Sequence, residues 1–183
     1  MLVLVRHARP HFPISGGPDE FHRGLTAEGE AQAADLVDPL LRLRPVRVVS
    51  SPYLRAVQTV QPLAAALDLP VETRADLREW DSGICPRPDY ADLYAQSWSE
   101  PGRARPGGES LRDLSARAVA ALTALAGDGT VVVGSHGTFV ARALAGFGVP
   151  GIDWPFCRAM PMPAVYRVRI GVAGTVATGP GMV

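Results

Sequence analysis

Leu2-Val3-Leu4-Val5-Arg6-His7 is the stretch that decides the fold, because an apolar run stops there at two polar residues. A short continuous apolar run that ends in polar residues is typical of a buried strand. Similar runs at 46–49, 71–73 and 130–133 predict three more strands, and segments with helical spacing lie between them. Strands that alternate with helices favour a parallel sheet covered on both faces. We therefore expect an α/β fold, namely a three-layer α/β/α sandwich with a mostly parallel central sheet.

The expected helices have recognisable beginnings and ends. Thr26 is the predicted N-cap of a helix that runs to about residue 44, and Pro39 is expected to kink or divide it. Ser51 and Pro52 fit the N-cap and the first position of a helix that runs to about residue 67. Further helices are expected at 109–126 and 138–145, with a helical piece near 90–98 and a hairpin of strands at 164–170 and 172–178. No repeat or linker interrupts this order, so residues 1–183 are predicted to form a single domain.

The composition excludes several kinds of chemistry. The 183 residues include 18 basic and 18 acidic ones, so no net field favours nucleic acid or an anionic membrane. The chain contains no lysine, which excludes Schiff-base catalysis and a P-loop lysine. Cys85 and Cys157 have no metal-type spacing, and no apolar stretch approaches the ~20 residues of a membrane helix. We expect a cytoplasmic protein that uses no metal and no cofactor.

Four polar residues lie just after three separate strands of the predicted sheet. Arg6 and His7 come directly after the first strand, Arg55 lies in the first turn of the helix after the second, and His136 follows the strand at 130–133. Ligands of open parallel sheets bind outside the carboxyl ends of the strands. The order of elements therefore predicts that two histidines and two arginines meet at one edge of the sheet.

Such a cluster is suited to phosphoryl transfer. Guanidinium groups donate several hydrogen bonds to a phosphate, and the helix N-terminus at Gly137 adds backbone N–H donors. A neutral imidazole can attack phosphorus, and neighbouring arginines lower its pKa and so keep it neutral. A second imidazole, when protonated, can hold an oxygen as charge builds up in the transition state. An alcohol leaving group also needs a proton, so an acid is expected nearby.

Six segments, in order, resemble the motifs of the histidine phosphatase superfamily, which includes phosphoglycerate mutases and broad-specificity phosphatases. The segments are Leu4-Val5-Arg6-His7, Gly24-Leu25-Thr26-Ala27-Glu28-Gly29 with Gln32-Ala33, Ser51-Pro52-Tyr53-Leu54-Arg55-Ala56-Val57-Gln58-Thr59, Leu77-Arg78-Glu79-Trp80-Asp81-Ser82-Gly83, Gly107-Gly108-Glu109-Ser110 and Val133-Gly134-Ser135-His136-Gly137. The resemblance spans residues 2 to about 140.

The resemblance implies a role for each core residue. His7 is similar to the histidine that accepts the phosphoryl group, and Arg6 and Arg55 are similar to the arginines that bind it. His136 resembles the second histidine, which steadies the transferred group. Glu79 resembles the acid that protonates the leaving oxygen and then activates water, with Asp81 as the alternative. The excursion at about 80–108 is expected to lie over this active site.

The chain also departs from the family pattern close to His7. Ala8 and Arg9 stand where the family usually has glycine and an acidic residue, and Arg9 either adds a cation to the pocket or points to solvent. Pro10 and Pro13 replace residues that donate to phosphate in many members. Backbone amides, His11 or Ser15 are candidates to compensate, and His22 and Arg23 are candidates for the substrate rim.

Three functions are compatible with this pattern. The preferred one is a phosphatase that hydrolyses phosphomonoesters through a phosphohistidine on His7 and acts on a small phosphorylated metabolite. A phosphoglycerate mutase would need lids that keep water out, and the excursion at 80–108 is the only candidate lid. A non-catalytic phosphoryl-binding protein of the same fold is motivated by the altered segment Ala8-Arg9-Pro10. The sequence gives neither the physiological substrate nor the oligomeric state.

Overall fold

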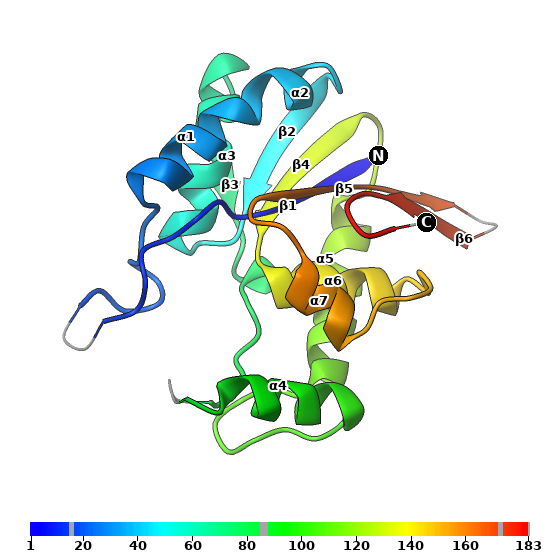
Figure 1. Cartoon of the computed structure of the whole chain (residues 1–183). Helices are drawn as coiled ribbons and strands as arrows, with labels where there is room; N and C mark the ends of the chain where they lie inside the picture. Colours follow the sequence, from blue (N-terminus) through cyan, green and yellow to red (C-terminus); the bar gives the residue numbers. More distant parts are fainter. Residues whose placement is uncertain (15–16, 85–87, 172–173, 183) are drawn as a thin grey trace.

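A computed structural model describes residues 1–14, 17–84, 88–171 and 174–182. Its centre is a sheet with the strand order β3-β2-β4-β1-β5-β6 (Figure 1). Strands β1 (Leu2–Arg6), β2 (Pro45–Ser50), β3 (Val71–Thr73) and β4 (Thr130–Ser135) run parallel to one another. Strands β5 (Ala164–Gly171) and β6 (Gly174–Thr178) pair antiparallel at one edge, β5 against β1. The parallel strands direct their carboxyl ends to one edge of the sheet.

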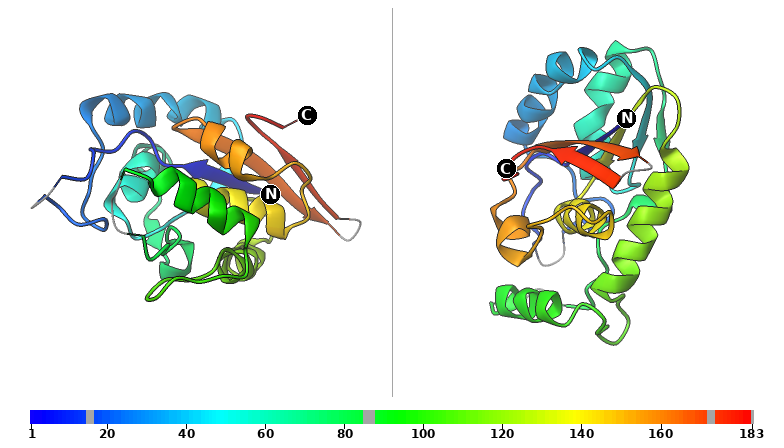
Figure 2. Two further views of the ribbon diagram at one scale, coloured as in Figure 1. Left: turned by 60° about the horizontal axis from the view of Figure 1, so that its bottom comes forward. Right: turned by 90° about the vertical axis from the view of Figure 1, so that its right-hand side faces the viewer.

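Alternate residues of the central strands face opposite helical layers. Val3 and Val5 pack with α2 and α3 in one buried cluster, whereas Leu2 and Leu4 belong to the cluster that contains α5 and α6. This is the two-residue periodicity of a strand that is buried on both faces. Figure 2 shows the two helical layers on either side of the sheet. The predicted three-layer α/β/α sandwich with a mostly parallel sheet is confirmed.

The first helical layer contains α1 (Ala27–Asp35), α2 (Val37–Leu41) and α3 (Leu54–Ala66). Thr26 caps α1 as predicted, since its side chain accepts from the N–H of Gly29. The helix expected to reach about residue 44 is divided, although the break lies at Leu36 and Pro39 falls inside α2. Pro62 is accommodated inside α3, which continues for a further turn.

The predicted start of α3 is wrong by two residues. Ser51 is not its N-cap and Pro52 is not its first residue, because the helix begins at Leu54 with Tyr53 at the N-cap position. The Ser51 hydroxyl has another partner, the imidazole of His136. A tertiary contact has thus taken the side chain that local sequence preference assigned to capping.

The second layer contains α5 (Leu111–Leu125), α6 (Gly137–Gly146) and α7 (Trp154–Ala159). A capping box fixes the start of α5: the Ser110 side chain accepts from the N–H of Asp113, and the Asp113 side chain accepts from the N–H of Ser110. Helix α7 has no counterpart among the predicted elements. The short 3-10 helix η1 (Ala75–Leu77) and α4 (Tyr90–Ser99) belong to the connection between β3 and α5.

Helix α4 lies apart from the sheet, below α7 and the start of α5 in Figure 1. Its Tyr94 ring packs edge-on against Trp80, with ring centroids 5.0 Å apart, and lies 5.7 Å from the Trp154 ring of α7. The expected helical piece near 90–98 is therefore present and is attached through aromatic side chains. Among the described residues, no helix combines the length and apolar character needed to cross a membrane.

Candidate active site

The carboxyl ends of β1, β2 and β4 bring His7, Arg55 and His136 together. His7 follows β1, and its N–H donates to the carbonyl oxygen of Ser135, the last residue of β4. The rings of His7 and His136 meet edge to face, with centroids 5.3 Å apart. Arg55, in the first turn of α3, is 3% exposed and reaches the same point. Residues distant in sequence thus form one cluster at this edge of the sheet.

The surroundings of His7 fix both its tautomer and its charge. Nδ1 lies 2.8 Å from the carbonyl oxygen of Ala8, which can only accept, so the ring proton is on Nδ1 and the lone pair is on Nε2. The pKa of His7 is lowered from 6.5 to about 3, chiefly by burial. The hydrogen bond to the Ala8 carbonyl opposes this shift, and the charges of Arg55, Arg6 and Arg23 add to it. At neutral pH, His7 therefore presents an unprotonated Nε2.

Two arginines on different elements carry charges that act on His7. The Arg55 Nε donates to His7 Nε2 over 3.3 Å. Arg6, the last residue of β1, donates from Nη1 to the carbonyl oxygens of Met160 and Pro161, and its buried Nε has no partner among the described residues. Gly137 is needed beside it, because a Cβ there would lie 3.1 Å from Arg6 Nε. Arg6 Nε is thus a buried donor available to a ligand.

His136 is fully buried at the N-cap position of α6. The Ser51 Oγ accepts from the N–H of Tyr53 at 3.3 Å and lies 2.8 Å from His136 Nε2. A hydroxyl that donates to Nε2 leaves the ring proton on Nδ1, which has no partner in the described part of the chain. Burial lowers the pKa of His136, as do the charge that His7 would carry and those of Arg55, Arg23 and Arg117, so the ring is neutral without ligand.

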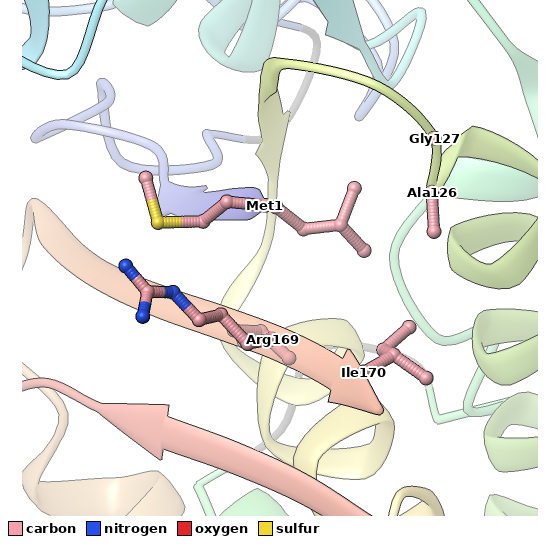
Figure 3. Close-up of a pocket in the computed structure, with 7 residues that line it drawn as sticks. Met1, Ala126, Gly127, Arg169 and Ile170 are labelled. Atoms are coloured by element: carbon pink, nitrogen blue, oxygen red, sulfur yellow. The ribbon is translucent and has the colours of Figure 1, made fainter. Parts of the chain in front are cut away.

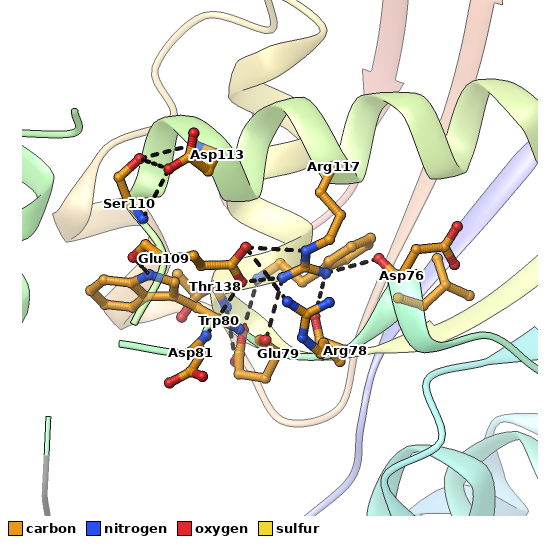
Figure 4. A network of polar contacts seen from close by, with 12 residues as sticks. Asp76, Arg78, Glu79, Trp80, Asp81, Glu109, Ser110, Asp113, Arg117 and Thr138 are labelled. Atoms are coloured by element: carbon orange, nitrogen blue, oxygen red, sulfur yellow. Dashed lines mark hydrogen bonds and ion pairs between the residues drawn. The ribbon is translucent and has the colours of Figure 1, made fainter. Parts of the chain in front are cut away.

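Glu79 reaches the same edge from the segment after η1 (Figure 4). Its Oε1 accepts from the N–H groups of Trp80 (2.9 Å) and Phe139 (3.0 Å), and its Oε2 accepts from that of Thr138 (3.3 Å). Thr138 and Phe139 lie in the first turn of α6, so the carboxylate caps a helix whose own N-cap side chain makes no such bond. Burial raises the pKa of Glu79, while these three bonds lower it.

The loop between β1 and α1, described at residues 10–14 and 17–25, contacts Arg55 through Glu20. Its ends are joined by the hydrogen bond from His11 N–H to the Gly24 carbonyl and by a bridge between Pro10 and Leu25. Inside the loop, the Glu20 carboxylate binds Arg23 with two hydrogen bonds (2.7 and 3.0 Å) and Arg55 Nη2 at 3.1 Å. A carboxylate that belongs to the chain itself, that of Glu20, therefore lies between Arg23 and Arg55. Sequence reasoning did not single out Glu20.

The remaining rim candidates lie in different places. Arg9 pairs with Glu28 at 3.1 Å, and both side chains are more than half exposed, so Arg9 points to solvent and away from His7. His22 is exposed and bonded to Asp19, and His11 is exposed as well. Arg23 is 13% exposed, and its charge acts on His7.

The other candidates named from the sequence are less central. Asp81, the alternative acid, is exposed, and its side chain accepts from the N–H of Gly83 at 3.4 Å. Ser15 and Cys85 lie outside the described residues. Thr59, which sequence reasoning cited only within a motif, fixes the chain beside His7, since its Oγ1 accepts from the N–H of Ala8 and donates to the Arg55 carbonyl.

A separate hollow of about 480 Å³ lies at the opposite end of the sheet, where β1 begins (Figure 3). It is lined by Met1, Leu2, Ala126, Gly127, Val168, Arg169 and Ile170. None of these residues belongs to the cluster around His7. Within the described ranges, no three histidine, cysteine or acidic side chains are grouped as metal ligands would be.

A sequence model of the histidine phosphatase superfamily (branch 1) matches residues 2–175. A glucosyl-3-phosphoglycerate phosphatase of Mycolicibacterium vanbaalenii is 26% identical over 178 residues, covering 87% of this chain and 79% of that protein. A probable phosphoglycerate mutase of Salmonella paratyphi C is 31% identical, covering 66% of this chain and 60% of the mutase. An uncharacterised protein of Mycobacterium tuberculosis is 44% identical over 79 residues, 42% of this chain and 38% of its own. The last two matches span less than two thirds of those relatives.

Solved structures of phosphatases have a similar fold. The mycobacterial glucosyl-3-phosphoglycerate phosphatase in complex with VO3 superimposes with a TM-score of 0.77 at 26% identity, covering 100% of this chain and 98% of the other. A mutant phosphoserine phosphatase of Entamoeba histolytica, in complex with phosphoserine, gives a TM-score of 0.78 at 19% identity, covering 98% and 96%. The second likeness concerns the fold alone.

Proposed function

The chain belongs to the histidine phosphatase superfamily, and from that premise we propose that it is a phosphatase that hydrolyses phosphomonoesters through a phosphohistidine on His7. One observation carries the proposal: the unprotonated Nε2 of His7 faces the guanidinium of Arg55, while Nδ1 is tied to the Ala8 carbonyl. A nucleophile with a fixed lone pair beside a fixed cation is what attack on a phosphoryl group requires.

In the first step, the lone pair on His7 Nε2 forms a bond to phosphorus while the ester P–O bond breaks. Arg6, Arg55 and the Nδ1–H of His136 donate to the phosphoryl oxygens. The leaving alkoxide takes a proton from Glu79, whose pKa is raised by burial. In the part of the chain that the structure describes, Oε2 of Glu79 accepts only the 3.3 Å bond from Thr138 and so has room for that proton. The step yields an alcohol and a phosphohistidine.

In the second step, water attacks the phosphorus and gives a proton to the Glu79 carboxylate. The P–N bond breaks, its electron pair returns to His7 Nε2, and orthophosphate leaves. Neither step calls on a metal ion, so we expect activity to survive dialysis against a chelator. The substrate we propose is a small phosphorylated metabolite, and the proposed location is the cytoplasm.

Phosphate trapping tests the proposal. The wild type, quenched during turnover of ³²P-labelled substrate, is expected to carry acid-labile label, and His7→Ala is expected to carry none. His22→Ala is the matched control, because His22 is an exposed histidine of the nearby loop. Label that persists in His7→Ala would contradict the assignment, and a wild type without label or turnover would favour a phosphoryl-binding protein.

The relative named as a phosphoglycerate mutase supports a second candidate, phosphoryl exchange without release. The two functions differ in what happens to the phosphohistidine. We expect free phosphate from a panel of phosphomonoesters, including p-nitrophenyl phosphate. Rapid interconversion of 3-phosphoglycerate and 2-phosphoglycerate with little free phosphate would identify a mutase.

A further inference from the structure

The segment that carries Glu79 has no regular secondary structure to hold it. The 3-10 helix η1 ends at Leu77, and residues 78–84 form neither helix nor strand. A general acid must stay within hydrogen-bond reach of the leaving oxygen. Contacts from outside the segment therefore have to fix the Glu79 backbone.

Arg117, on α5, binds the backbone of Glu79 and of the residues just before it (Figure 4). Its Nη1 donates to the carbonyl oxygens of Asp76 (2.8 Å) and Arg78 (3.0 Å), and its Nη2 donates to that of Glu79 at 3.4 Å. The guanidinium is 14% exposed and lies over the Phe139 ring, with Cζ 5.8 Å from the ring centroid. A planar fork with five N–H groups can satisfy several carbonyls at once, which an ammonium group cannot do in the same geometry.

Glu109 completes the arrangement from the other side. Its carboxylate accepts from Arg117 Nε (3.2 Å) and Nη2 and also from the N–H of Asp81. Its backbone N–H donates to the Asp81 carbonyl (2.8 Å), and its carbonyl accepts from Trp80 Nε1 (2.8 Å). Gly108 lets the chains approach this closely, since a Cβ there would lie 2.7 Å from the Asp81 carbonyl oxygen. Glu109 thus fixes the segment after Glu79 while holding Arg117 in place.

We propose that Arg117 and Glu109 form a positioning pair that holds the Glu79 carboxylate where it can exchange a proton with the leaving oxygen. This inference rests on the proposed function of Glu79. Neither residue contacts His7 in the described hydrogen-bond network, and both act through the backbone at 78–81. Loss of the pair is therefore expected to weaken proton transfer while the attack by His7 remains.

Leaving-group dependence distinguishes this role from a merely structural one. p-Nitrophenolate leaves without a proton, whereas a simple alkyl alcohol needs one. For Arg117→Lys and Glu109→Gln we expect kcat/KM to fall about tenfold or more on an alkyl phosphate and less than about threefold on p-nitrophenyl phosphate. Glu79→Gln is expected to show the same split with a larger loss on the alkyl phosphate. Equal losses on the two substrates would overturn the proposal.

Arg47→Lys is the matched control. Arg47 makes a two-pronged contact with Glu72 (3.1 and 2.7 Å), as Arg117 does with Glu109. That pair joins β2 to β3 on the surface, with both side chains more than 40% exposed. The ratio of the two kcat/KM values is expected to stay unchanged in Arg47→Lys.

Amide hydrogen exchange supplies a measurement that needs no turnover. The N–H groups of Trp80, Thr138 and Phe139 bond to the Glu79 carboxylate, so they are expected to exchange faster in Arg117→Lys than in the wild type. Amides of β4 are expected to keep their rates. Unchanged exchange at all three positions would overturn the proposal. A wild type that forms no phosphohistidine would refute the function of the site, while the exchange rates would still decide the positioning role.

Discussion

At the scale of single residues, burial sets the protonation state of His7. In water, about half of the histidine side chains are protonated near pH 6.5. The protonated imidazolium has no free lone pair on Nε2. In the folded chain, burial and three arginine charges favour the neutral ring, and the Ala8 carbonyl selects its tautomer. The sequence places His7 next to one of these arginines, Arg6, while the fold supplies the other two.

The same burial makes the stability depend on pH. The pKa of His7 is about 3 in the folded chain and 6.5 in the unfolded chain. Between these two pH values, the unfolded chain binds a proton on this ring and the folded chain does not. The free energy of unfolding therefore falls as the pH drops from 6.5 towards 3, by up to about 1.4 kcal/mol per pH unit from this group. When the pH is lowered from 7.5 to 5.0, the free energy of unfolding in urea is expected to fall in both proteins. The fall is expected to be about 2 kcal/mol smaller in His7→Gln than in the wild type.

His22→Gln is the control for this measurement, because His22 is exposed. It is expected to show the pH dependence of the wild type, since His7 and its buried surroundings are unchanged. A His7→Gln variant with the same pH dependence as the wild type would show that His7 is protonated in the folded protein.

At the scale of elements, helix α3 and the loop before α1 meet at Arg55. Helix α3 brings Arg55, and the loop brings Glu20, whose backbone carbonyl also accepts from Arg55 Nη1 at 2.6 Å. The Phe21 ring packs on Tyr53 with centroids 4.4 Å apart. The loop is thus docked on the start of α3 by polar and aromatic contacts, with a carboxylate close to the proposed phosphate site.

Removing the charge of Glu20 is expected to strengthen anion binding. A carboxylate between Arg23 and Arg55 competes with a phosphate for the same guanidinium groups. For Glu20→Gln, we expect the inhibition constants of orthophosphate and vanadate to fall about threefold to tenfold, with kcat little changed. Asp19→Asn is the control, because Asp19 is exposed and bonds His22 instead. Weaker inhibition would mean that Glu20 holds the two arginines in place.

Gly29 provides a second test at this scale. Alanine in place of a helical glycine usually stabilises by about 1 kcal/mol. In α1, however, a Cβ at Gly29 would lie 2.1 Å from the Arg9 carbonyl oxygen, which also accepts from the N–H of Thr26. We expect Gly29→Ala to destabilise by about 2 kcal/mol in chemical denaturation. Gly127→Ala, where a Cβ meets nothing within 4 Å, should be nearly neutral. Stabilisation by Gly29→Ala would show that α1 can move away from the Arg9 backbone.

At the scale of the whole molecule, the sheet with its two helical layers has more extensive buried contacts than helix α4. The layers share buried clusters that run across the strands. Helix α4 has a single buried residue, Ser97, and contacts the rest mainly through Tyr94 and Trp98. A segment with few buried contacts opens at a lower free energy than the core.

The attachment of α4 can be tested through Tyr94. For Tyr94→Ala, we expect amide exchange in α4 to accelerate at least tenfold, while exchange in β1 and β4 changes little. Hydrogen exchange followed by mass spectrometry on both regions gives this comparison, with Tyr90→Ala as control because Tyr90 is more than half exposed. Equal acceleration in α4 and the strands would mean that α4 unfolds only with the whole domain.

The prediction that residues 80–108 lie over the active site can be examined in the same variant. Tyr94 packs on Trp80, the residue that follows Glu79, so helix α4 reaches the residue next to the proposed acid. Changed relative rates on small and bulky phosphomonoesters in Tyr94→Ala would support the prediction, and an unchanged profile would contradict it.

The sequence by itself determined the sheet, the alternation of strands and helices along the chain, and the delivery of Arg6, His7, Arg55 and His136 to one edge. Hydrophobic periodicity and chain order suffice for that, because parallel strands must end on the same side. The role of Glu79 came only from a family resemblance, since nothing local separates it from other carboxylates. Tertiary structure decided what Ser51, Glu20 and Arg117 do, because their partners lie far along the chain or in an irregular loop. Long-range hydrogen bonds and burial set protonation and position, and neither leaves a periodic pattern in the sequence.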